Sequence, residues 1–92
     1  NNLLPVKTEL SGSYPNPFNP TTSIEYGLQN DGHVEIMVYD ASGRLVEELV
    51  NQNQPQGYHS ITWNASSQAS GMYFVKMVAG DVVQTQKLVL LK

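Results

Sequence analysis

The stretch Tyr14-Pro15-Asn16-Pro17-Phe18-Asn19-Pro20-Thr21-Thr22 decides how this chain begins its fold. Each proline fixes its own φ angle and lacks a backbone N–H donor. Each residue that precedes a proline is pushed toward the β or polyproline region. The sequence therefore predicts a stiff, extended segment with few ladder hydrogen bonds, and strand signals follow it.

Alternating polar and apolar residues run from this stretch to the end of the chain. They predict strands over residues 23–28, 33–40, 58–64, 71–79 and 82–91. In the first of these, Ile24, Tyr26 and Leu28 share one face. Residues 44–50 fit either a short strand or one helical turn, and residues 51–57 indicate a polar loop.

Turn signals separate these segments. Glycines in Asp31-Gly32, Ser42-Gly43 and Gly80-Asp81 supply the backbone freedom that tight turns need. Turns roughly every 8 to 12 residues are typical of immunoglobulin-like domains. We therefore predict an all-β fold, an immunoglobulin-like antiparallel β-sandwich of about seven strands. The domain spans residues 14–92, and residues 1–13 form a linker or the edge of the domain.

The composition argues against several classes of function. The net charge is −3 and the five basic residues are scattered, so the chain has no basic footprint for nucleic acid. It has no Cys, and no apolar run approaches the ~20 residues that span a bilayer. Because it lacks both an initiator Met and a signal-peptide pattern, we expect it to be part of a longer protein.

Two pairs of residues invite a chemical interpretation. His33 and Glu35 share a strand face and could begin a metal site, but the sequence offers no third ligand that can be placed beside them. His59 and Ser60 are adjacent on a strand, so they point to opposite faces and cannot form a nucleophile–base pair. We therefore expect no catalytic residues, no metal and no cofactor.

Exposed aromatic residues would support a different function, glycan binding. The residues that could form an aromatic platform are Tyr26, Tyr39, Tyr58, Trp63 and Phe74. Alternation places Trp63 with Ile61 in the core and leaves Tyr39 and Phe74 facing outward. An accessory carbohydrate-binding module of a secreted hydrolase and a passive spacer both remain alternatives.

The apolar end of the chain also has two interpretations. Leu88-Val89-Leu90-Leu91-Lys92 fits a final strand with one buried face. It equally fits a terminal segment that a receptor recognises. Periodicity alone does not separate these two interpretations.

Several blocks of the chain, taken together in order and spacing, carry a family resemblance. They are Tyr14-Pro15-Asn16-Pro17-Phe18-Asn19-Pro20-Thr21-Thr22, Gly32-His33-Val34, Val38-Tyr39-Asp40, Gly57-Tyr58-His59, Thr62-Trp63-Asn64, Ser70-Gly71-Met72-Tyr73-Phe74 and Lys87-Leu88-Val89-Leu90-Leu91-Lys92. This set closely resembles the C-terminal sorting domains of type IX (Por-type) secretion systems, over about residues 10–92. The fold group is also similar to the Ig-like domain of flagellar hook-capping proteins.

The resemblance implies a non-catalytic sorting signal at the C-terminus of a larger secreted protein from Bacteroidetes or related bacteria. Such a cargo reaches the periplasm by its own signal peptide. An outer-membrane translocon then recognises the folded domain, and a surface sortase-like peptidase removes it upstream of the first motif. The predicted location of the cargo is the cell surface or the medium.

Matched residue by residue, the resemblance also implies a sorting motif. Its members are Pro15, Asn16, Pro17, Gly71, Tyr73, Lys87, Leu88, Val89, Leu90, Leu91 and Lys92. We expect Gly71 to serve a close approach or an unusual φ angle, and Tyr73 to point inward as in a tyrosine corner. The motif then acts mainly in folding, while the tail and an exposed edge contact the receptor.

Overall fold

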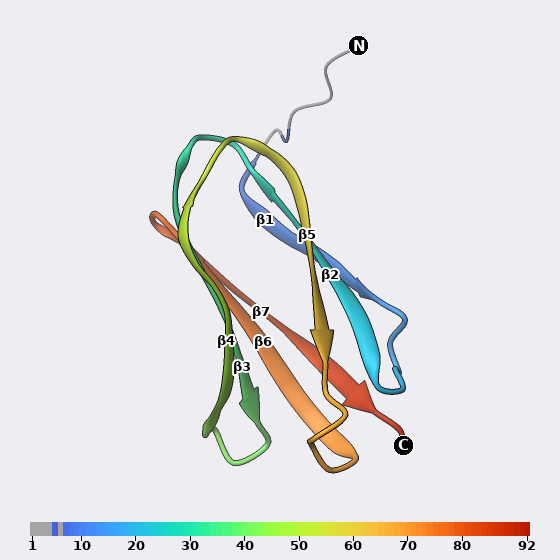
Figure 1. The fold of residues 1–92 in the computed structure, drawn as a ribbon. Helices are drawn as coiled ribbons and strands as arrows, with labels where there is room; N and C mark the ends of the chain where they lie inside the picture. Colours follow the sequence, from blue (N-terminus) through green and yellow to red (C-terminus); the bar gives the residue numbers. More distant parts are fainter. Residues whose placement is uncertain (1–4, 6) are drawn as a thin grey trace.

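The chain folds into two packed antiparallel β-sheets and, within the described part, has no helix. The computed structural model describes Pro5 and residues 7–92. The strands are β1 (Glu9–Tyr14), β2 (Thr21–Leu28), β3 (Gly32–Asp40), β4 (Leu45–Gln54), β5 (Gly57–Asn64), β6 (Gly71–Ala79) and β7 (Val82–Leu90). The first sheet has the order β1-β2-β5 and the second β4-β3-β6-β7 (Figure 1). The predicted all-β sandwich is confirmed.

The strand order is that of an immunoglobulin-like sandwich with one strand moved. Constant-type immunoglobulin domains place strands ABED in one sheet and CFG in the other. Here the fourth strand, β4, pairs with β3 and therefore joins the second sheet.

No segment of the described residues forms a helix that could span a membrane.

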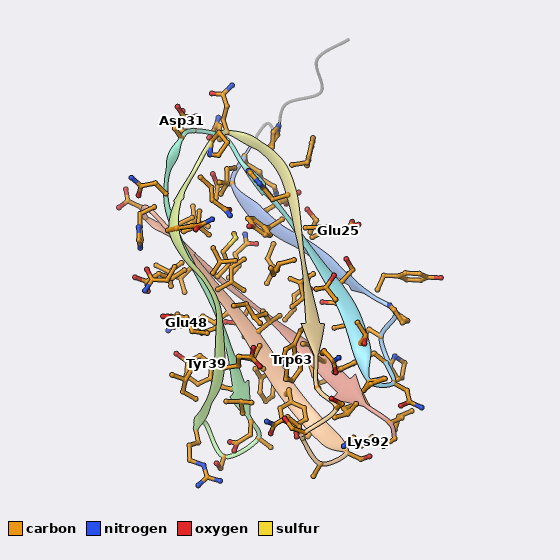
Figure 2. The ribbon with its side chains drawn as sticks, viewed as in Figure 1. Glu25, Asp31, Tyr39, Glu48, Trp63 and Lys92 are labelled. Carbon is orange, nitrogen blue, oxygen red and sulfur yellow. The ribbon has the colours of Figure 1, made fainter. Side chains whose placement is uncertain are left out.

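Alternation within the strands builds the core between the sheets. The predicted inward face of β2 is confirmed, because Ile24, Tyr26 and Leu28 are all buried. The second sheet contributes its own inward residues, which are Val34, Ile36, Val38, Tyr73, Val75, Met77, Leu88 and Leu90. Trp63 of β5 lies between the sheets, as alternation predicted (Figure 2).

Strand β4 corrects two sequence-based predictions. Of the two alternatives for residues 44–50, the short strand is confirmed and the helical turn is wrong, and residues 51–54 extend the strand instead of forming a loop. The pairing with β3 shifts register twice, which leaves Val46 and Leu49 as the extra residues of two β-bulges. The bulges interrupt strict alternation in β4, and this interruption produced the apparently helical spacing of its apolar residues.

The two sheets are joined along the edges of β1 and β7. The side chain of Gln84 accepts a hydrogen bond from the backbone N–H of Leu10 at 2.6 Å. The side chain of Gln86 donates to the carbonyl of Leu10 at 3.3 Å. Because β1 begins at Glu9 and pairs with β2, the strand crosses the position where the sequence suggested a domain boundary, between residues 13 and 14.

The sandwich is elongated, with principal extents of 39 × 26 × 16 Å, and its two ends carry different features. Asp31, in the turn between β2 and β3, and Lys92 lie at opposite ends (Figure 2). At the Asp31 end, the backbone N–H of Gln29 donates to the hydroxyl of Thr8 at 3.0 Å. Thr8, which directly precedes β1, therefore lies at the end opposite to the C-terminal tail.

Candidate functional site

The proline-rich segment forms a hook, residues 15–20, that reaches from the first sheet to the last strand of the second. The amide nitrogen of Asn16 donates to the carbonyl of Lys87 at 2.9 Å. Its amide oxygen accepts from the backbone N–H of Val89 at 3.0 Å. One side chain thus satisfies a donor and an acceptor on the free edge of β7, as a neighbouring strand would.

Phe18 continues this contact with its backbone. Its N–H donates to the carbonyl of Val89, and its carbonyl accepts from the N–H of Leu91, both at 2.9 Å. Phe18 and Leu90 form an isolated parallel bridge. The hook is thus bent, where the sequence predicted an extended segment, because its hydrogen-bond partners lie on the other sheet. The peptide bonds that precede Pro15, Pro17 and Pro20 are cis.

The hook is anchored in the core. The buried hydroxyl of Thr22 donates to the carbonyl of Pro15 at 2.8 Å. The ring of Phe18 is buried against Trp63, with 5.5 Å between centroids. The indole N–H of Trp63 in turn donates to Glu47 at 3.1 Å. Sequence reasoning did not include Phe18 and Thr22 among the site residues, although both stand in the quoted stretch.

Gly71 and Tyr73 lie beside the tail, at the start of β6. They pair with Leu90 and Leu88 of β7. Tyr73 is buried, its ring meets Trp63 edge-on at 5.4 Å, and its hydroxyl donates to the carbonyl of Ala69 at 2.6 Å. Gly71 has a φ of +154°, and a Cβ there would meet nothing within 4 Å. Backbone conformation, not close approach, therefore explains this glycine.

The tail itself is part of the fold. Leu88 and Leu90 are fully buried, whereas Lys87, Leu91 and Lys92 are exposed. The backbone N–H of Lys92 donates to the hydroxyl of Ser70 at 3.0 Å, and its ammonium donates to the carbonyl of Ser66 at 2.7 Å. The structure thus brings the three separate parts of the predicted motif together at one end of the sandwich. A final strand with a buried face is established, and its recognition remains a prediction.

The residues considered for catalysis or metal binding lie elsewhere. Nε2 of His33 is 3.6 Å from Glu35 and 2.7 Å from the side-chain oxygen of Asn51. In the described ranges, Pro5 and 7–92, no group of three or more His, Cys, Asp or Glu side chains could hold a metal ion. His59 faces inward and stacks on Tyr26 with 5.3 Å between centroids, while exposed Ser60 points the other way.

The aromatic residues do not gather on one surface. Tyr26 and Trp63 are buried in the core. Tyr58 is exposed on the first sheet, whereas Tyr39 and Phe74 pair with each other on the outer face of the second.

Burial raises the pKa of the Tyr26 hydroxyl, and the hydrogen bond from this hydroxyl to Gln54 acts in the opposite direction.

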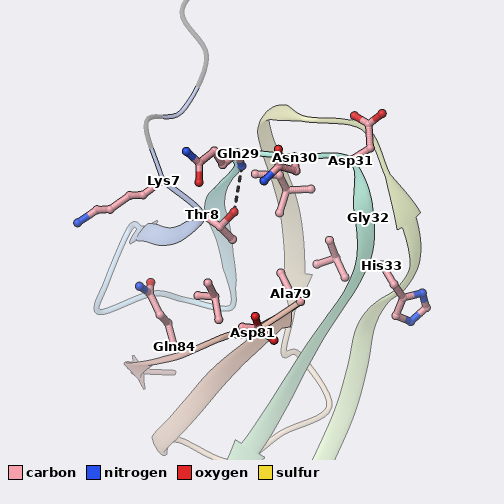
Figure 3. A pocket seen from close by; sticks show the side chains of 14 residues that line it. Lys7, Thr8, Gln29, Asn30, Asp31, Gly32, His33, Ala79, Asp81 and Gln84 are labelled. Atoms are coloured by element: carbon pink, nitrogen blue, oxygen red, sulfur yellow. Dashed lines mark hydrogen bonds between the residues drawn. The ribbon is translucent and has the colours of Figure 1, made fainter.

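A cleft of about 650 Å³ opens at the end opposite to the tail (Figure 3). The turn that follows β2, the turn between β6 and β7, and the chain before β1 surround it. Thr8, Gln29 and Asp81 lie at its rim (Figure 3). None of the predicted motif residues lines it.

The folded domain is thus a cysteine-free immunoglobulin-like sandwich whose first motif holds its last strand in place. The chain matches the family described as "Secretion system C-terminal sorting domain" over residues 13–91. It belongs to this family, and it is a C-terminal sorting signal for type IX secretion. The family implies an attached upstream cargo, recognition by the secretion machinery, and export to the cell surface or the medium. Neither the curated proteins nor the solved structures contain a match to this chain.

Proposed function

We propose that this domain is the substrate, not an enzyme, of an outer-membrane translocon that it reaches from the periplasm. The folded sorting unit includes β1 and therefore begins by Glu9, and a larger cargo protein precedes it. A surface sortase-like peptidase then separates the two. Because β1 already begins at Glu9, the bond that is cleaved lies upstream of that residue.

The observation that carries this proposal is the position of the tail relative to the cargo junction. The tail is fixed at one end of the sandwich by Asn16 and Phe18. Thr8, which directly precedes β1, lies at the opposite end, where its hydroxyl accepts a hydrogen bond from Gln29 (Figure 3). A translocon can therefore contact the tail of the folded domain while the cargo is still attached.

The hook and the tail have different roles within the motif. Within the hook, Asn16 holds β7 through two hydrogen bonds, and the carbonyl of Pro15 accepts one from Thr22. Gly71 and Tyr73 shape the adjoining end of β6. These residues act through folding. Lys87, Leu91 and Lys92 remain exposed and contact the receptor.

The primary test is export of a fluorescent protein fused upstream of residues 1–92. The host is a bacterium with a cognate type IX translocon, compared with a strain that lacks it. Surface or secreted fluorescence that requires the translocon supports the proposal. A correctly folded fusion that stays in the periplasm of the cognate host contradicts it.

Deleting the tail would be a misleading version of this test. Removal of residues 87–92 takes away Leu88 and Leu90, both fully buried. Each buried leucine is worth about 2–5 kcal/mol, and small domains are stable by only about 5–15 kcal/mol. The deletion is therefore expected to unfold the domain, so substitutions of exposed tail residues are the informative variants.

A further inference from the structure

The tail strand is closed to a partner in most directions. One edge of residues 87–90 pairs with β6, and Asn16 and Phe18 occupy the other edge. Its inward side chains, Leu88 and Leu90, are buried. A partner that binds the folded domain can therefore touch the outward side chains of the tail, which are Lys87, Val89 and Leu91, and the exposed Lys92 that follows them.

These outward residues continue into an apolar surface on the outer face of the second sheet. We call this surface the outer patch, and its residues are Tyr39, Leu45, Met72, Phe74, Val89 and Leu91. Cross-strand pairing makes it continuous: Met72 lies opposite Val89, Phe74 opposite Tyr39, and Tyr39 opposite Leu45. The exposed fractions are 56% for Leu91, 54% for Leu45 and 47% for Met72.

The outer face of the first sheet is different in character. Its β2 and β5 positions are mainly small and polar, and they include Ser23, Ser60 and Thr62. Its two exposed tyrosines, Tyr14 and Tyr58, are not neighbours, because they lie opposite Ser23 and Gly27 of β2. Contiguous exposed apolar surface on a small domain marks an interaction site more often than scattered apolar residues do. The tail therefore lies beside the more apolar of the two outer faces.

Two lysines border the outer patch on the side of β6 and β7, while the acidic residues of the same outer face, Glu35 and Glu48, lie on β3 and β4. Lys87 lies opposite Phe74, and Lys76 lies two residues further along β6 on the same face. The salt bridges within the described part of the chain involve Lys7, His33 and Arg44, and neither of these two lysines. The net charge of the chain is −3. A matching partner would present an apolar surface bordered by carboxylates.

We propose that the outer patch is the surface by which the folded domain docks on a protein of the secretion machinery. This inference rests on the proposed function, which requires that machinery to bind the folded domain. The apolar side chains supply the buried centre of the interface, while Lys76 and Lys87 face acidic groups of the partner at its border.

Export of the fluorescent fusion tests this inference with substitutions that leave the core intact. Met72→Ser combined with Leu91→Ser removes exposed apolar contacts, and Lys87→Glu reverses a border charge. We expect the double serine variant to lower translocon-dependent export by about tenfold, the size of a central interface contact. The charge reversal at the border should lower export by a smaller factor. The melting temperature of each purified domain should stay near that of the wild type.

Two controls match these variants. Val83 is 58% exposed, and it lies on the same face of β7 toward the other end, so Val83→Ser should leave export unchanged. Thr62→Glu places a carboxylate on the outer face of the first sheet and should also be neutral.

The outcomes separate this inference from the proposed function. If the wild-type fusion is exported and the folded patch variants are exported equally well, the docking inference is overturned while the sorting function stands. If the wild type fails in a cognate host, the sorting function itself is contradicted. Flotation of the purified domain with anionic lipid vesicles, abolished by Lys87→Glu, would identify a membrane contact and also overturn the protein-docking inference.

Discussion

At the scale of single residues, Asn16 is the side chain that connects the first motif to the tail. It makes one donor and one acceptor contact with β7. We expect Asn16→Ala to lower the free energy of unfolding by about 1–2 kcal/mol, because two hydrogen bonds are lost at an exposed site. Urea unfolding of the purified domain measures this change.

Two further substitutions show whether hydrogen bonding is the cause. Asn16→Asp keeps the acceptor for Val89 but places a carboxylate against the carbonyl of Lys87, so it should not restore stability. Asn19→Ala, at an exposed position in the same hook, should be close to neutral. Equal losses for Asn16→Ala and Asn19→Ala would show that Asn16 does not hold the tail.

Asp40 makes the stability of the turn between β3 and β4 depend on pH. Its carboxylate accepts from the hydroxyl of Ser42 and from the backbone N–H groups of Ser42 and Arg44. These hydrogen bonds, the Ser42 hydroxyl foremost, lower the pKa of Asp40. A lowered folded-state pKa stabilises the protein above the unfolded-state pKa of about 4, and this stabilisation is lost as pH falls through the folded-state value.

We therefore expect Asp40→Asn to be less stable than the wild type at pH 7. The difference should shrink as pH falls below about 4, because the wild-type carboxyl then becomes neutral too. Thermal unfolding of both proteins between pH 2 and pH 7, a span of about five units around that value, checks this. A difference that stays constant over the whole series would rule out the ionised carboxylate as its cause.

At the scale of elements, the start of β6 depends on the backbone of Gly71. Its φ of +154° is rarely adopted by residues with a side chain, although the space around it is open. We expect Gly71→Ala to cost about 1–3 kcal/mol through backbone strain alone. Gly32 begins β3 in equally open space and lies outside that φ region, so Gly32→Ala should be neutral or slightly stabilising. Similar losses for both would contradict a conformational role for Gly71.

The elements also show which parts of the fold the sequence could predict. Alternation correctly located β2, β3, β5, β6 and β7, because each of these strands has one buried face. It left β4 open between a strand and a helical turn, because bulges at Val46 and Leu49 break the two-residue period there. Bulges depend on pairing with β3, which is a tertiary property and leaves no local signal.

The candidate site was predictable only in part, for a similar reason. The motif residues could be named by resemblance, and the inward side of Tyr73 by alternation. The contacts of Asn16 with Lys87 and Val89 join residues more than 70 positions apart in the chain. The local conformational rules for proline favoured an extended segment, and they could not include the hydrogen bonds that bend the hook toward β7.

At the scale of the whole molecule, we expect the two ends of the sandwich to have separate roles. The cargo end contains Thr8 and the turn at Gly80 and Asp81, which both border the cleft of Figure 3. The tail end contains the loop of residues 65–70, which contacts Lys92 and Tyr73. If the machinery reads only the tail end, changes of shape at the cargo end should be tolerated.

Insertions of a flexible Gly/Ser segment of about eight residues test this division. Placed between Gly80 and Asp81, the insertion should leave export of the fusion near the wild-type level, because loop closure costs only about 1–2 kcal/mol. Placed between Ser66 and Ser67, it enlarges the loop beside the tail. This insertion should lower export severalfold, although its free-energy cost of loop closure is the same. Melting temperatures of both purified domains control for folding. Equal export of two equally stable insertion variants would show that the tail end is not the one that the machinery reads.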